Sequence, residues 1–269
     1  MPTTVAMAPK IPPCGRDKLL NPRDELLNLS FRTGPPLPFR PCDPVSAGPT
    51  LRLMNQTAII TGASQGLGLA LARQLAARRY NLVLNARRVE RLETAARELS
   101  KLTDVETVAG DVSEIAEEIA QRAHDRFGAV DLLINNASEL GPLPMPALAS
   151  YPWFPLLRVF RVNAVAPLHL TQLVLPRMKE RGSGTIINIS SDAAVNAYTG
   201  WGGYGASKAA LRHLSMTLSV ELEGTGVRVL SIDPGDMNTE MHRDATGGGD
   251  LSHLPLPEDV APEILRRAV

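Results

Sequence analysis

Tyr204 and Lys208 lie four residues apart in the segment Tyr-Gly-Ala-Ser-Lys, and Ser191 precedes the tyrosine by thirteen residues. Positions i and i+4 share one face of a helix, so this spacing predicts an ammonium group beside a phenol. A free phenol has a pKa of about 10, and a neighbouring cation is expected to lower it. With the Ser191 hydroxyl, the pair could bind a carbonyl oxygen and protonate it. The spacing alone is more often that of a half-buried tyrosine followed by a solvated lysine.

A glycine-rich segment follows the apolar residues 57–61, which are typical of a buried parallel strand, and precedes the helical pattern of residues 69–75. Glycines at this junction permit positive φ and close backbone approach, and the N-terminus of the next helix offers N–H groups to an anion. The segment therefore predicts a pyrophosphate-binding turn. The alternative is a glycine-rich turn between strand and helix that binds no ligand. The residues expected in the turn are Gly62, Ser64, Gln65, Gly66, Leu67 and Gly68.

Further motifs follow in order along the chain: Asp111-Val112, Asn135-Asn136-Ala137-Ser138, Asn163, Ser190-Ser191, and Pro234-Gly235-x-x-x-Thr239. Together with the glycine turn and the Tyr-Lys pair, they resemble the short-chain dehydrogenase/reductase family, from about Gln56 to Glu263. The family usually has glycine where this chain has Ser138.

The resemblance implies an oxidoreductase that transfers a hydride between NADP(H) and a carbonyl or alcohol. Ser191 would bind the carbonyl oxygen and Tyr204 would donate the proton. Lys208 would bind the nicotinamide ribose and lower the tyrosine pKa, and Asn163 would order a relay water. Both residues could instead have purely structural roles, with Ser191 capping a strand end and Asn163 satisfying buried backbone groups. The other residues implied at the cofactor are Asp111, Val112, Asn136, Ala137, Pro234, Gly235, Met237 and Thr239.

The choice of cofactor is read at the end of the second predicted strand, residues 82–88. An NAD enzyme usually has a carboxylate there for the ribose 2′-hydroxyl, whereas arginine accommodates a 2′-phosphate. Ala86 occupies the expected acidic position and Arg87 follows it. NADP(H) is therefore favoured. The alternative is that Arg87 and Arg88 are solvated charges at the start of a helix.

Strand-like and helix-like segments alternate, which predicts an α/β fold: a doubly wound, Rossmann-like parallel sheet with helices on both faces, in a single domain. Helices are expected near residues 154–181, 203–223 and 257–267. The last strand typical of the family is missing. The family often uses this region for subunit contacts, so its absence weakens the expectation of a homo-oligomer. The expected strands lie near residues 57–61, 81–86, 105–109, 131–135, 184–190 and 227–233.

Composition excludes several classes of function. The formal net charge of +0 argues against binding to nucleic acid or to a membrane surface, and no apolar run is long enough for a membrane span. The two cysteines, Cys14 and Cys42, lie outside the predicted domain, and no metal-ligand pattern accompanies them. We therefore expect no metal and a cytoplasmic location.

Residues 1–53 differ from the rest because they are rich in proline and have no sustained period. They predict a disordered extension preceding a catalytic domain at 54–269. A partner-binding arm and a translation start at Met54 both remain compatible with this sequence.

The substrate is a small carbonyl or alcohol compound whose identity the sequence does not specify. The walls of its site are expected from residues 139–151 and from the glycine-rich, mobile residues 236–256. Met237, Met241 and Trp201 predict an apolar lining. The competing hypothesis is a nucleotide-sensing or scaffolding protein without turnover, against which the complete set of Ser191, Tyr204 and Lys208 argues.

Overall fold

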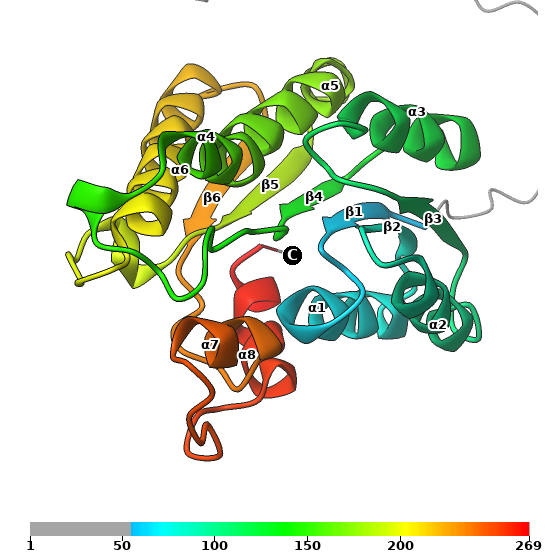
Figure 1. Cartoon of the computed structure of the whole chain (residues 1–269). Coiled ribbons are helices and arrows are strands. Elements are labelled where there is room, and N and C mark those ends of the chain that lie inside the picture. The colour runs from blue at the N-terminus through cyan, green and yellow to red at the C-terminus, as the bar shows by residue number, and fades with distance from the viewer. Residues whose placement is uncertain (1–54, 269) are drawn as a thin grey trace, which may run out of the picture. The chain divides into compact units, whose positions relative to one another are not determined.

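The computed structural model describes residues 55–268, so the predictions for residues 1–53 and their two cysteines lie outside the described part. A six-stranded parallel sheet forms the centre, in the order β3-β2-β1-β4-β5-β6. Helices cover both of its faces (Figure 1). The predicted Rossmann-like α/β class is confirmed. Its strands are β1 (Thr57–Thr61), β2 (Asn81–Ala86), β3 (Val105–Ala109), β4 (Leu132–Asn135), β5 (Gly184–Ile189) and β6 (Val227–Ile232).

Alternating side chains of the strands pack into two hydrophobic cores, one on each face of the sheet. Ile60 joins the core formed with α1, α2 and α8, whereas its neighbour Ile59 joins the core formed with α3, α5 and α6. Burial on both faces explains the apolar runs of the central strands β1 and β4. The helices are α1 (Gly66–Ala77), α2 (Val89–Leu99), α3 (Ala116–Phe127), α4 (Trp153–Phe160), α5 (Ala166–Arg181), α6 (Gly202–Glu221), α7 (Glu240–Ala245) and α8 (Pro257–Arg266).

The segment predicted as one helix near 154–181 is interrupted. A π-helical segment, η2 (Arg161–Val165), separates α4 from α5 and contains Asn163. Wide π turns are often found at functional sites. Short 3₁₀ turns, η1 (Leu148–Ser150) and η3 (Asp192–Ala194), lie in the loops after β4 and β5. No helix within residues 55–268 is long and apolar enough to cross a bilayer.

The strand order reverses between β1 and β4, which are neighbours in the sheet although β2 and β3 separate them in sequence. The chain runs outward from β1 through β2 to β3, then returns to β4 and continues outward on the other side. Loops at the carboxyl ends of strands diverge at such a switch point and leave a crevice. The fold therefore places the glycine turn after β1 and the asparagines after β4 at one opening.

Candidate active site

A cleft with a volume of about 870 Å³ lies at the carboxyl ends of the strands. That volume lies in the range of about 300–1,000 Å³ that is typical of small-molecule binding clefts. Most of the predicted site residues line it, as do the neighbouring Arg88 and Arg91. Gly68 and Asn163 do not line the cleft. The predicted residues that the structure brings together here are Gly62, Ser64, Gln65, Gly66, Leu67, Arg87, Asp111, Val112, Asn136, Ala137, Ser191, Tyr204, Lys208, Pro234, Gly235, Met237 and Thr239.

The glycine turn is built for close backbone packing. Gly62 and Gly66 have φ values of +67° and +52°, which L side chains rarely adopt. A Cβ on Gly68 would lie 2.3 Å from the carbonyl oxygen of Gly62 and 2.6 Å from Asn136 Nδ2. Asn136 Nδ2 in turn donates to the Thr61 carbonyl oxygen at 2.9 Å. Gly68 therefore lets α1 approach the turn and does not itself line the cleft.

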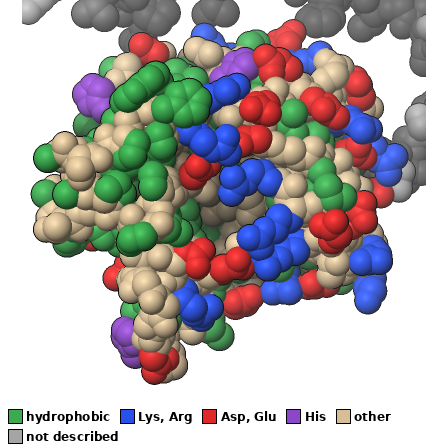
Figure 2. Space-filling model, viewed as in Figure 1, with side chains coloured by type: hydrophobic (Ala, Val, Ile, Leu, Met, Phe, Trp, Pro, Cys, Tyr) green, Lys and Arg blue, Asp and Glu red, His purple; other side chains and the backbone are tan. Residues whose placement is uncertain are grey.

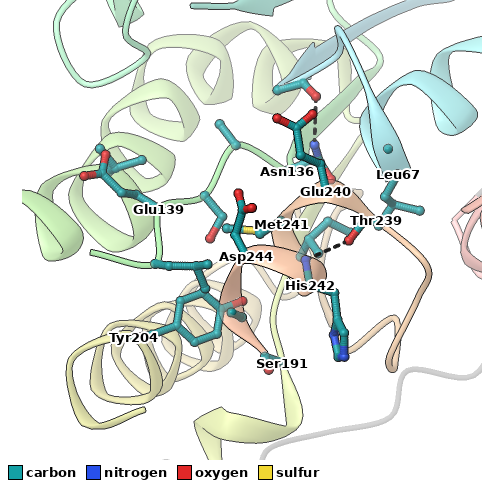
Figure 3. A pocket seen from close by; sticks show the side chains of 18 of the residues that line it. Leu67, Asn136, Glu139, Ser191, Tyr204, Thr239, Glu240, Met241, His242 and Asp244 are labelled. Carbon is teal, nitrogen blue, oxygen red and sulfur yellow. Dashed lines mark hydrogen bonds between the residues drawn. The ribbon is translucent and has the colours of Figure 1, made fainter. Parts of the chain in front are cut away.

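Tyr204 and Lys208 lie on α6 and are both buried, while Ser191 follows β5 (Figure 3). Lys208 Nζ lies 5.6 Å from the centroid of the Tyr204 ring and donates to the Ile189 carbonyl oxygen at 2.8 Å. Ser191 Oγ accepts from the Ala193 N–H at 3.2 Å, so the serine does cap the turn after β5. The Ser191 hydroxyl also donates to Asp192 Oδ1 at 3.0 Å, so it can donate to a substrate oxygen only when its proton turns away from Asp192.

The two titratable groups are shifted in opposite directions. Burial raises the pKa of Tyr204 to about 12, although hydrogen bonds with Ser138 and Ser191 oppose the rise. Burial lowers the pKa of Lys208 to about 8. The sequence had predicted that the lysine lowers the tyrosine pKa. In the structure the Tyr204 pKa is raised instead, because burial destabilises the phenolate more than hydrogen bonds with Ser138 and Ser191 stabilise it.

Asn163 is buried, and protein groups use its side-chain amide fully. Its Oδ1 accepts from the Glu139 N–H at 2.8 Å and from Ser138 Oγ at 3.2 Å. Its Nδ2 donates to the Glu139 carbonyl oxygen and to Ser207 Oγ, both at 2.9 Å. The amide thus ties η2 to the loop after β4, which agrees with the alternative that Asn163 satisfies buried backbone groups. A role in ordering a relay water stays a prediction.

Charged side chains form the wall at the end of β2. Arg87, 61% exposed, lies 3.5 Å from Glu139. Arg158 of α4 donates to Glu139 at 2.9 Å and to Asp111 at 2.9 Å. Burial opposes ionisation of Asp111, but hydrogen bonds from Ser113 and Arg158 outweigh it and lower the pKa of this carboxyl group. The Asp111 carboxylate is therefore occupied by protein partners.

Two charged residues of this wall escaped the sequence analysis. Arg91, in the first turn of α2, binds Glu240 of α7 at 2.7 Å, and Arg88 binds the same carboxylate at 3.3 Å. The position of Arg91 four residues after Arg87 was a signal visible in the sequence. Glu240 lay in the segment predicted as a mobile wall, where nothing in the sequence indicated its partners.

The other end of the cleft is lined by apolar and aromatic side chains. Trp201 packs edge-on against Tyr204 with ring centroids 5.7 Å apart, and Met241 belongs to the same cluster. Met237 also lines the cleft, but its side chain packs into the core beneath α1. Part of the segment predicted as a mobile wall is the helix α7, whose first turn Thr239 caps by accepting from the His242 N–H at 3.1 Å.

Comparison with known proteins gives one consistent assignment. A family model described as short chain dehydrogenase matches residues 56–248. Serine 3-dehydrogenase of Agrobacterium fabrum is 35% identical over 212 residues, covering 78% of this chain and 83% of that enzyme. Sulfoacetaldehyde reductase 2 of Chromohalobacter salexigens is 35% identical over 213 residues, with coverage of 78% and 83%. L-Sorbose reductase of Gluconobacter frateurii, solved in complex with NADPH and L-sorbose, superposes with a TM-score of 0.69 at 30% identity, covering 78% and 88%.

These matches agree with the geometry of the cleft. The matched residues include the glycine turn at the sheet's switch point and the Tyr204–Lys208 pair on α6. The relatives are dehydrogenases and reductases that act on small molecules, and each match covers more than two thirds of both chains. The resemblance predicted from the motifs is confirmed: the chain belongs to the short-chain dehydrogenase/reductase family of oxidoreductases.

Proposed function

We propose that this oxidoreductase transfers a hydride between NADP(H) and a small carbonyl or alcohol compound, with Tyr204 as the general acid and base. The observation that carries the proposal is the layout of one continuous cleft. Ser191, Tyr204 and Lys208 line one end, arginines line the other, and the glycine turn lies between them. A dinucleotide with a phosphate on its adenosine ribose fits this order of groups.

The residues of the cleft have donors to spare for such a cofactor. Lys208 carries three N–H donors, and within the described residues its one hydrogen-bond partner is Ile189. Two donors are left for the hydroxyls of a nicotinamide ribose. The glycine turn would hold the diphosphate, and Arg87 would bind the 2′-phosphate. NADPH, when bound, supplies the hydride.

The catalytic residues then handle the substrate oxygen and its proton. Ser191 and Tyr204 would hydrogen-bond the carbonyl oxygen, which orients the carbon and stabilises the charge that develops on the oxygen. Tyr204 would donate its proton to that oxygen during reduction and accept it back during oxidation. Asn163, by holding η2 against the loop after β4, would keep this end of the cleft in shape.

Support for NADP(H) comes from two sources. Arg87, Arg88 and Arg91 all line the cleft, and no carboxylate follows β2 at the position that NAD enzymes use for the ribose hydroxyls. L-Sorbose reductase, which shares the fold at 30% identity, was solved with NADPH.

The test is a panel of aldehydes, ketones and quinones, assayed by the loss of NADPH absorbance with wild-type protein and with Tyr204→Phe. We expect turnover of at least one substrate class by the wild type, with turnover at least a hundredfold lower in the variant and nearly unchanged NADPH binding. Substantial turnover by Tyr204→Phe would refute the role of the tyrosine. NADPH binding without turnover across the panel would support the nucleotide-sensing alternative.

A homo-oligomer is part of the proposal. Figure 2 shows apolar side chains gathered over α4. Trp153 and Phe154 are 72% and 69% exposed, and Leu157 on the same helix is exposed as well. Apolar patches of this kind mark contact surfaces more often than free surface. Sedimentation of the purified chain over a range of concentrations tests the assembly.

A further inference from the structure

Glu240 joins two parts of the cleft that are distant in sequence. It is the first residue of α7, directly after Thr239, whereas Arg88 and Arg91 lie at the start of α2. Its Oε1 accepts from Arg88 Nη1 at 3.3 Å and its Oε2 accepts from Arg91 Nη1 at 2.7 Å. Arg91 also donates to Gln65 of the glycine turn. One carboxylate therefore ties α7 to the arginines of the cofactor wall.

This arrangement is the one that a phosphate would adopt. The two oxygens of a single anion each accept from a different guanidinium, next to Arg87, to which the proposed function assigns the 2′-phosphate. The hydrogen bond from Arg91 lowers the pKa of Glu240, so the group is an anion at neutral pH. Both arginines and the glutamate are roughly half exposed, which means that water can replace either partner at little cost.

Arg87 differs from its two neighbours. Its contact with Glu139 is 3.5 Å long, and Glu139 is held at the same time by the shorter contact with Arg158. The Arg87 side chain is also the most exposed of the three, at 61%. An incoming phosphate would thus meet Arg87 with little competition, whereas Arg88 and Arg91 are already neutralised by Glu240.

We propose that Glu240 is a cofactor-specificity residue that competes with the 2′-phosphate of NADP(H) for Arg88 and Arg91. The inference rests on the proposed NADP(H) function. Binding of the phosphate releases Glu240, since two anions close together on the same guanidinium groups repel each other. The release also removes the ties between α7 and α2, and α7 carries Met241 of the substrate end. Glu240 therefore weakens binding of 2′-phosphorylated ligands and leaves binding of the unphosphorylated ones unchanged.

The experiment is calorimetric titration of the full chain with 2′,5′-ADP and with 5′-AMP, which requires no turnover. Glu240→Gln removes the charge and keeps the shape. Two exposed ion pairs predict that this variant binds 2′,5′-ADP about threefold to thirtyfold more tightly, with 5′-AMP unaffected. Glu98→Gln is the matched control, because Glu98 pairs with Arg73 outside the cleft with similar exposure. In an Arg91→Ala background the gain from Glu240→Gln should shrink.

The other outcomes overturn the inference in distinguishable ways. Unchanged binding of 2′,5′-ADP by Glu240→Gln would show that no competition exists. Weaker binding would show that Glu240 closes over the bound ligand and assists it. If the wild type binds 2′,5′-ADP no more tightly than 5′-AMP, and Glu240→Gln does the same, the NADP(H) assignment fails and the competition fails with it.

Discussion

Replacing Asn163 with alanine separates the two roles that the sequence left open for this residue. The substitution removes four hydrogen bonds between η2, the loop after β4 and α6, in a place where the side chain is fully buried. Two of the lost partners are backbone groups of Glu139. A relay-water role alone would need none of these four contacts.

The expected cost follows from the groups left without partners. A buried donor or acceptor that loses its partner costs about 1–3 kcal/mol. Ser207 keeps its hydrogen bond to the Tyr204 carbonyl oxygen, so the main loss falls on the N–H and carbonyl of Glu139. We expect Asn163→Ala to lower the free energy of unfolding by about 3–4 kcal/mol. For a domain of this size that corresponds to a fall in melting temperature of about 10 °C.

The assay is urea unfolding followed by circular dichroism, with Asn196→Ala as the control because Asn196 is exposed. The control should unfold within about 0.5 kcal/mol of wild type. If Asn163→Ala proves as stable as the control, the four hydrogen bonds do not hold η2 and the structural reasoning is wrong. A stable but inactive variant would assign Asn163 to the chemistry alone.

Three further changes test the cofactor wall, the glycine turn and the buried lysine. Arg87→Ala should weaken NADPH binding tenfold or more, because a charge-assisted pair contributes roughly 1.5–3 kcal/mol. NADH binding should be unchanged. Equal losses of affinity for both cofactors in titrations would refute binding of the 2′-phosphate by Arg87. Gly68→Ala places a Cβ 2.3 Å from a carbonyl oxygen and should lower the free energy of unfolding in urea by about 1–3 kcal/mol. Gly249→Ala is the control, because a Cβ there meets nothing within 4 Å and should leave stability unchanged. Burial lowers the Lys208 pKa from 10.5 to about 8, so the ammonium costs stability below pH 8 and the cost fades as pH rises toward 10.5. Lys208→Met should therefore raise the free energy of unfolding, measured in urea, by about 2 kcal/mol at pH 7 and by progressively less toward pH 10. An increase that does not depend on pH would contradict the lowered Lys208 pKa.

The sequence predicted the central strands well because side chains on both of their faces are buried, which requires a run of apolar residues. All six predicted strands are present within one residue at either end. Helix α6 was also expected within two residues, since its apolar face packs on the sheet. Local sequence was sufficient wherever a segment's own apolar pattern determines its structure.

Features that depend on distant partners were not predictable in the same way. The π turn around Asn163 is tied to Glu139, which lies 24 residues earlier, and no local pattern reports that contact. Helix α7 lies in a segment whose glycines suggested only mobility. Its Glu240 reaches arginines about 150 residues earlier in the chain. Gly68 was predicted as a ligand contact because the motif does not distinguish glycines that touch a ligand from those that allow helix packing.

The Tyr204–Lys208 pair shows that helical spacing can predict which two side chains lie close together without predicting their pKa values. Helical spacing predicts a cation near a phenol, but burial acts on both groups and favours the neutral form of each. The Tyr204 pKa rises to about 12 and the Lys208 pKa falls to about 8. Near neutral pH the phenol therefore keeps its proton and the lysine is still mostly charged. Under the proposed function, carbonyl reduction needs this protonated phenol, whereas alcohol oxidation needs the phenolate, which the raised pKa makes scarce near neutral pH.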